Sequence, residues 1–226
     1  MVNVLEGLWA NGTELLGADG TLFPDPVRAE EVLGFVRMLL AEGVSPPWVT
    51  AADEELTRRA FGDGRAIFLR NWPYAMDLFE LPDSPVRGKV GIAPLPRHAH
   101  GSRSAGASGG AHLGVFARTR HPAAAVALTR FLASEASQKA MAAGVALNPT
   151  RTALYRDGDL VRGHPNLPRI YALAAAARPR PITPYHLMIS TTLQPEFSAV
   201  LVGLTTPADA VARARRHIEH LLQGIR

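Results

Sequence analysis

The chain has 226 residues, of which 47% are hydrophobic and 19% charged, and its formal net charge is +4. This composition is typical of a globular protein with enough apolar residues for a substantial core. Because the chain has no cysteine, disulfides, Cys-ligated zinc, iron–sulfur clusters and thiol nucleophiles are excluded.

Helix and strand signals alternate in the first half of the chain. Asp25-Pro26 predicts a helix start, because an N-cap carboxylate precedes a proline at the first helical position, and Gly43 predicts the helix end. Thr50 is expected to cap a second helix, which stops at Gly64. Short apolar runs between turn residues predict three buried strands, at 66–69, 90–93 and 113–116. One apolar face of the first helix is expected from the spacing of Val32, Phe35, Val36, Leu39 and Leu40.

Helices dominate the second half. Residues 97–110, rich in Ser, Gly, His and Arg, predict an exposed loop. Helices are expected after Pro122 and from about Ser134, and residues 145–168 are expected to be mostly loop. The last three helices are predicted at about 166–177, 187–202 and 207–223, the last with an apolar stripe of Val211, Ala214, Ile218, Leu221 and Leu222. Strands separated by helices indicate an α/β protein.

Five segments resemble one protein family. Residues 61–74 read Phe-Gly-Asp-Gly-Arg-Ala-Ile-Phe-Leu-Arg-Asn-Trp-Pro-Tyr. This run resembles the family 1 extracellular solute-binding proteins of ABC sugar importers, especially their maltose- and trehalose-binding members. Four further segments resemble the same family in its own order: 90–96, 109–115, 178–185 and 204–210.

The resemblance implies a periplasmic-binding-protein-like (type II) fold, in which two α/β lobes joined by hinge strands hold a ligand between them. It assigns residues 1–107 to the first part of the C-terminal lobe and 156–226 to its helical second part. Residues 108–155 would be a segment that returns to the N-terminal lobe. Most of the N-terminal lobe is therefore expected to lie outside this chain, and residues 1–7 do not have the pattern of an export signal.

The resemblance also implies a function. The chain is expected to be the substrate-binding component of an ABC importer, and to supply one face of a cleft for a maltose- or trehalose-like saccharide. Its partners would then be a small saccharide, the permease subunits and the N-terminal lobe, in an extracytoplasmic (periplasmic or cell-surface lipoprotein) setting. Neither catalysis nor a cofactor is expected, and apolar surface left uncovered predicts self-association. The alternative is an interaction or regulatory module that keeps the lobe fold without transport.

Aromatic side chains are the first candidates for sugar contact, because rings suit the C–H faces of a sugar. Trp72 and Tyr74 follow the predicted strand 66–69, and their spacing places both on one side of an extended chain. The resemblance makes them a sugar platform, whereas a cap on the hydrophobic core is the alternative. Trp9, with Glu6 and Asn11 beside it, is either a ligand contact or a core residue.

Polar candidates come from two other matching segments. Gly110 would let the backbone approach a ligand closely. His112 follows Ala111, at which relatives often carry Trp, and is either a donor to a hydroxyl or a structural histidine. Arg178 and Arg180 offer forks of donors for vicinal hydroxyls, with Arg180 favoured by the resemblance and a surface arginine as the alternative.

Other kinds of site have weaker support. Asp53, Glu54 and Glu55 cluster at a predicted helix start, where acidic residues favour the helix dipole, so they are not interpreted as a catalytic pair. His98 and His100, with His112 or His121, match no strong metal signature, and no metal is expected. The basic pairs 58–59 and 215–216 are isolated inside helix-like stretches, which indicates solvated faces and no nucleic-acid partner.

Overall fold

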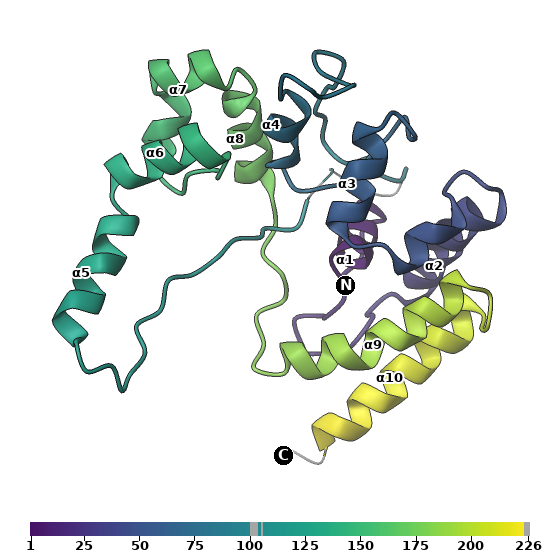
Figure 1. Cartoon of the computed structure of the whole chain (residues 1–226). Coiled ribbons are helices and arrows are strands. Elements are labelled where there is room, and N and C mark those ends of the chain that lie inside the picture. Colours follow the sequence, from purple (N-terminus) through teal and green to yellow (C-terminus); the bar gives the residue numbers. More distant parts are fainter. Residues whose placement is uncertain (100–103, 105, 224–226) are drawn as a thin grey trace. The chain divides into compact units, whose positions relative to one another are not determined.

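The computed structural model describes residues 1–99, 104 and 106–223 (Figure 1). By its internal contacts the chain forms two compact units, which are described one at a time. Unit 1 consists of Met1–Asp53, Pro94–Ser108 and Ala177–Arg226, and unit 2 of Glu54–Ala93 and Gly109–Ala176. The assignment of 1–107 and 156–226 to one lobe, and of 108–155 to the other, stays a prediction.

The described residues of unit 1 form four α-helices and one 3-10 helix: α1 (Val2–Ala10), α2 (Pro26–Ala41), η1 (Pro47–Ala51), α9 (His186–Leu201) and α10 (Pro207–Gln223). Helices α9 and α10 pack on each other and on α2, and α1 packs on α2. Their shared core is fully apolar at its centre, where Leu5, Leu33, Leu193 and Val200 are buried. Burial of such side chains stabilises a fold by roughly 1.5–3 kcal/mol each.

The signals at both ends of α2 are confirmed, and the predicted apolar stripe of α10 is confirmed in part. Asp25 is the N-cap of α2, and its carboxylate accepts a hydrogen bond from the Arg28 N–H. Gly43 follows the helix with φ +69°, a left-handed conformation that glycine adopts without strain. Val211, Ala214 and Ile218 of the predicted α10 stripe are buried. Leu221 is exposed, and the side chain of Leu222 lies outside the described part of the chain.

Unit 2 contains α3 (Glu54–Gly62), α4 (Ala75–Phe79), α5 (Pro122–Leu132), α6 (Glu135–Val145), η2 (Thr152–Arg156), α7 (Gly158–Gly163) and α8 (Leu167–Ala176). A second core lies where α6, η2, α7 and α8 meet. It contains Ala142, Leu154, Tyr155, Leu160, Leu167 and Ile170.

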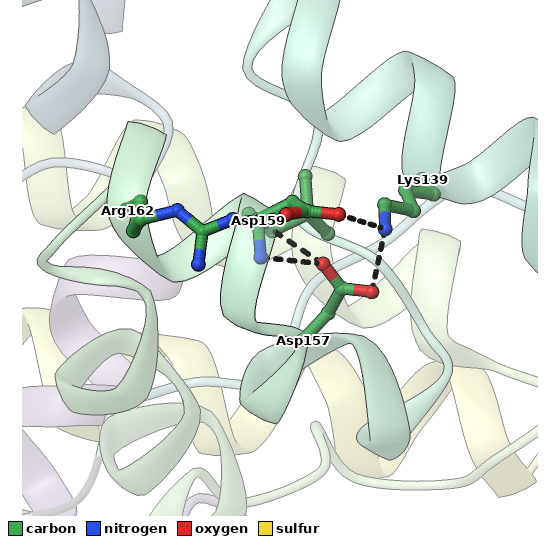
Figure 2. A network of polar contacts seen from close by, with 5 residues as sticks. Lys139, Asp157, Asp159 and Arg162 are labelled. Carbon is green, nitrogen blue, oxygen red and sulfur yellow. Dashed lines mark hydrogen bonds and ion pairs between the residues drawn. The ribbon is translucent and has the colours of Figure 1, made fainter.

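A polar network fixes the start of α7 (Figure 2). Asp157 is the N-cap, and its carboxylate accepts from the Asp159 and Leu160 N–H groups. The Lys139 ammonium of α6 donates to Asp157 at 2.7 Å and to Asp159 at 3.2 Å, and Arg162 pairs with Asp159. This network joins α6 to α7 across the surface of unit 2.

The three predicted strands are wrong for this structure. Among the described residues only two isolated bridges occur, Leu16–Leu22 and Ala107–Arg178, and 66–69, 90–93 and 113–116 are irregular. Ile67 and Phe68 are 86% and 90% exposed instead of buried. A strand is stable only when a neighbouring strand satisfies its backbone and a packed layer covers its apolar face. No described segment pairs with these three.

Most predicted helices are confirmed, with four corrections. The helices at 122–132, 135–145, 167–176, 186–201 and 207–223 agree with prediction, and Ser134, near which a helix start was expected, is the N-cap of α6. Thr50 lies inside η1 instead of capping α3. Residues 145–168 contain η2 and α7 as well as loops, and α1 and α4 were not predicted. Phe35 is exposed although the spacing in α2 placed it on the apolar face. No helix in the described ranges is long and apolar enough to cross a membrane.

Candidate functional site

The segment between α3 and α4 carries the two predicted platform residues of unit 2. It leaves α3 through Gly64, whose φ of +73° makes the turn, then runs exposed through Phe68 and is half-buried from Leu69 onward. Residues 70–74 form the tip of this segment, and the side-chain amide of Asn71 makes two hydrogen bonds there. Its Nδ2 donates to the Glu54 carbonyl at 2.9 Å, and its Oδ1 accepts from the Trp72 N–H at 2.7 Å. The tip is therefore anchored to the first turn of α3.

Trp72 is half-buried and lies against two neighbours. The Arg70 guanidinium carbon is 4.8 Å from the centroid of the indole, the geometry of a cation–π contact. On Gly109, a Cβ would lie 2.7 Å from Cζ3 and 2.9 Å from Cη2 of the indole. The ring therefore occupies the space that a side chain at 109 would need.

Tyr74 is half-buried and hydrogen-bonded to a carboxylate. Its hydroxyl donates to Glu55 Oε1 at 2.5 Å, and Glu55 Oε2 accepts from Arg58 Nε and Nη2 at 3.0 and 2.8 Å. The bond to the carboxylate, followed by burial, raises the pKa of Tyr74 to about 12. The bonds from Arg58 and then from Tyr74 lower the pKa of Glu55.

Trp9 lies in the core of unit 1, with 4% of its surface exposed. Its indole N–H donates to Glu14 Oε2 at 2.9 Å, and Glu14 Oε1 accepts from Arg178 Nη2 at 2.7 Å. The Arg178 guanidinium also lies 4.7 Å from the Trp9 ring centroid. Of the two alternatives for Trp9, this geometry favours core packing, and its role toward a ligand stays a prediction.

The polar neighbours of Trp9 are also buried. The Glu6 carboxylate accepts from the Ala107 N–H at 2.9 Å. Asn11 Nδ2 donates to the Arg28 carbonyl at 3.1 Å and to Glu31 at 2.8 Å, while its Oδ1 has no hydrogen-bond partner in the described structure. These contacts hold α1 against the rest of unit 1.

Gly110 and His112 of unit 2 and Arg180 of unit 1 are exposed. Nothing lies within 4 Å of the position of a Cβ on Gly110. The side chains of His112 and Arg180 make no hydrogen bond or ion pair with another described residue. The structure thus brings Trp72 together with the Gly109–Gly110 segment and with Tyr74 on one tip, whereas Trp9 and Arg180 belong to the other unit.

The metal hypothesis gains no support from the described residues. They contain no group of three His, Asp or Glu side chains that could hold a metal ion. The backbone N–H of His98 donates to the Ala10 carbonyl at 3.0 Å, and His100 lies outside the described residues.

A small polar pocket of about 310 Å³ was not predicted from the sequence. It lies in unit 2 between α4 and the end of α7, and two of its lining side chains, His164 and Asp77, approach each other to 3.1 Å between Nδ1 and Oδ2. Its other lining residues are Glu80, Arg87, Gly163, Pro165 and Asn166. These residues share no motif and no regular spacing in the sequence, so the pocket becomes visible only in the folded structure.

Sequence reasoning also missed the contacts that support the tip. The sequence assigned no role to Asn71, interpreted Glu55 as a carboxylate that favours the helix dipole, and contained Gly109 only as part of the matching segment 109–115. One signal could have identified Gly109. A Gly-Gly pair in a segment that resembles a sugar-binding family indicates that another group approaches the backbone closely, and here that group is the ring of Trp72.

Comparison with known proteins identifies relatives of this chain. A family model described as bacterial extracellular solute-binding protein matches residues 2–168. A relative from Deinococcus radiodurans, named probable ABC transporter-binding protein, is 29% identical over 215 residues, which cover 95% of this chain and 50% of the relative.

Solved structures agree with this family. The maltose-bound MalE3 protein of T. maritima is 32% identical, with a TM-score of 0.86 over 97% of this chain and 57% of that chain. An ABC transporter solute-binding protein from Agrobacterium radiobacter K84, in complex with ribitol, is 23% identical, with a TM-score of 0.86 over 96% of this chain and 55% of its own. The expected periplasmic-binding-protein fold is thus confirmed, and the chain spans about half the length of the relatives it matches.

Proposed function

This chain belongs to the bacterial extracellular solute-binding proteins, and from that premise we propose that it supplies one face of a site for a small saccharide or polyol in an ABC importer. The proposal does not extend to catalysis. Its location would be that of the family, outside the cytoplasm, and its partners the permease subunits and the lobe that completes the cleft.

The observation that carries the proposal is the anchored tip with Trp72 and Tyr74. A sugar or polyol needs an apolar surface for its C–H groups and hydrogen-bonding groups for its hydroxyls. The tip offers a half-buried indole, a phenol oxygen and the Arg70 guanidinium within five residues. Because Asn71 and Glu55 already hold the tip, little conformational entropy is lost when a ligand binds.

The ligand class follows from the names of similar structures. Four of them are described as bound to maltose, alpha-D-tagatose, ribitol and D-mannitol. These compounds share vicinal hydroxyls and carry no charge. We therefore propose a neutral polyhydroxylated ligand for this chain, with a maltose- or trehalose-like saccharide as the narrower possibility. Gly110, His112, Arg180 and Trp9 remain proposed contacts of the same ligand.

The proposed mechanism is closure of two lobes over the ligand, because the closed form makes contacts that the open form cannot. The chain passes between unit 1 and unit 2 four times, and the last two passages follow Ser108 and precede Ala177. Beside these points Ala107 bridges Arg178, and the Ser108 N–H donates to the Arg178 carbonyl at 2.7 Å. This short paired segment is a suitable hinge, since few groups must rearrange when the chain bends there.

Uncovered apolar surface supports a further polypeptide partner. Helix α5 buries none of its residues, and Leu128 and Phe131 are exposed. Such a surface is typical of an interface. We propose that the complementary lobe covers it, and self-association of this chain stays a prediction. Light scattering after size exclusion measures it: a concentration-dependent mass supports self-association, and a monomer at all concentrations contradicts it.

The experiment that tests the function is a ligand panel followed by tryptophan fluorescence and NMR. The panel contains maltose, D-tagatose, ribitol and D-mannitol, with L-lysine and a dipeptide as controls of another chemical class. We expect saccharides or polyols to change the Trp72 signals and the controls to leave them unchanged. Trp72→Ala should remove the response. A response to the controls alone would contradict the proposal.

A further inference from the structure

The acidic first turn of α3 touches the Trp72–Tyr74 tip at two points. The Glu54 carbonyl accepts from Asn71 Nδ2 at 2.9 Å, and the Glu55 carboxylate accepts from the Tyr74 hydroxyl at 2.5 Å. The sequence alone explains the carboxylates of Glu54 and Glu55 by their favourable interaction with the helix dipole. In the structure one of them holds a proposed ligand contact.

The Glu55 carboxylate is held by Arg58 through one of its oxygens and by Tyr74 through the other. Arg58, three residues further along α3, donates two hydrogen bonds to Oε2, at 3.0 and 2.8 Å. Both bonds converge on this one oxygen, so they hold the position of Oε2 and leave the other oxygen of the carboxylate without an arginine partner. Oε1 is left to accept from Tyr74, so the chain Arg58–Glu55–Tyr74 sets the direction of the phenol O–H bond.

We propose that Glu55 is the positioning residue of Tyr74 and makes the phenol oxygen a hydrogen-bond acceptor for a ligand hydroxyl. A phenol has one proton to donate and two lone pairs. Since the proton is committed to Glu55, only the lone pairs face a ligand. This inference rests on the proposed function of the tip, which it makes more specific.

The consequence is selection among ligand groups. A sugar or polyol hydroxyl can donate to the Tyr74 oxygen, so a neutral polyhydroxylated ligand satisfies it. A carboxylate oxygen or an ether oxygen has no proton to donate and leaves that contact unmade. At this position Tyr74 therefore favours free hydroxyls over sugar acids and O-methyl sugars.

The same bond has a signature that can be measured without any ligand. The carboxylate raises the pKa of Tyr74 to about 12, against an ordinary value of 10.0. If Glu55→Gln removes the negative charge, the pKa falls toward 10.0. At pH 10.5 a phenol with a pKa of 10.0 is roughly three quarters ionised, whereas one with a pKa of about 12 stays protonated.

The test is ¹³C NMR of labelled tyrosine at pH 10.5, with Tyr74→Phe to assign the resonance and circular dichroism to confirm the fold. Glu135→Gln is the matched control, because Glu135 also lies in the first turn of a helix and its carboxylate makes no bond with a described residue. We expect Tyr74 to ionise in the Glu55→Gln variant but not in the wild type or the control. Equal ionisation in all three would overturn the positioning role.

A second measurement uses ribitol and maltose as probes. If Tyr74 accepts from a ligand hydroxyl, Tyr74→Phe and Glu55→Leu, which has no acceptor for the phenol proton, should both weaken binding by about threefold to tenfold, the loss of one hydrogen bond, and Glu135→Leu should not. Unchanged affinity in the Glu55 variant would overturn the proposal. If the wild type binds neither probe, the proposed function fails, whereas the titration of Tyr74 still decides the Glu55–Tyr74 pairing.

Discussion

Replacement of Gly109 by alanine tests the contact that supports the Trp72 ring. The added Cβ would lie 2.7 Å from Cζ3 and 2.9 Å from Cη2 of the indole. Carbon atoms pack best at about 3.5–4.0 Å, so the ring must move by at least about 0.8 Å. Insertion of a methyl group into such a contact typically costs about 1–3 kcal/mol.

The neighbouring glycine supplies a matched control. A Cβ on Gly110 meets nothing within 4 Å, so Gly110→Ala adds no clash. Both substitutions reduce the conformational entropy of the unfolded chain by the same amount, about 0.4–1 kcal/mol in free energy. This contribution cancels in the comparison, and the Gly109→Ala variant should be less stable than the Gly110→Ala variant by about 1–3 kcal/mol.

Urea unfolding measures the difference, and the Trp72 indole N–H resonance reports the position of the ring. We expect the resonance to move in the Gly109→Ala variant and to stay in place in the Gly110→Ala variant. Equal stability of the two variants, together with an unmoved indole resonance, would refute the packing of Trp72 on Gly109.

Two further predictions concern the stability of the units. Gly7→Ala places a Cβ 2.7 Å from Val32 Cγ1 in the core of unit 1 and should lower the free energy of unfolding by about 1–3 kcal/mol. Gly34→Ala, whose nearest neighbour is at 3.9 Å, should not lower it. The hydrogen bond from Lys139 lowers the pKa of Asp157 below its ordinary value of 3.8. At a pH above 3.8 the ionised Asp157 therefore stabilises unit 2, and this stabilisation is lost as the pH falls through the lowered pKa. Between pH 7 and pH 3 the melting temperature should therefore fall more in the wild type than in the Asp157→Asn variant. Equal pH dependence of the two melting temperatures would contradict the pairing.

Local signals in the sequence were sufficient for most of the longer helices but not for the extended segments. Asp25, Ser134 and Gly43 act through backbone bonds within a few residues, so their roles are readable without a fold. The strand at 66–69 was predicted from composition, and a strand depends on a neighbour that may be any distance away in sequence. Ile67 and Phe68 have the residue types of a buried strand and, among the described residues, no layer to cover them.

In the candidate site, too, some residues were predicted from a local pattern and others became apparent only from the fold. Trp72 and Tyr74 were predicted because aromatic residues next to a turn are recognisable in a matching segment. Glu55 and Gly109 were not, because each acquires its role from a residue at least nineteen positions away: Glu55 from Tyr74, and Gly109 from Trp72. Side-chain contacts of this range follow from the fold and are not encoded in a local pattern.

The most direct test of the central claim is an NMR titration of the ¹⁵N-labelled chain, observed at its three Trp indole N–H groups. Trp72→Phe assigns the relevant resonance, and ribitol and maltose are added to about 100 mM so that millimolar binding, about −4 kcal/mol, is detected. We predict a saturable shift of the Trp72 resonance with at least one of the two ligands and none with L-lysine. If no saccharide or polyol moves that resonance, or if lysine moves it equally, the assignment of the Trp72–Tyr74 tip as a sugar-binding face is contradicted.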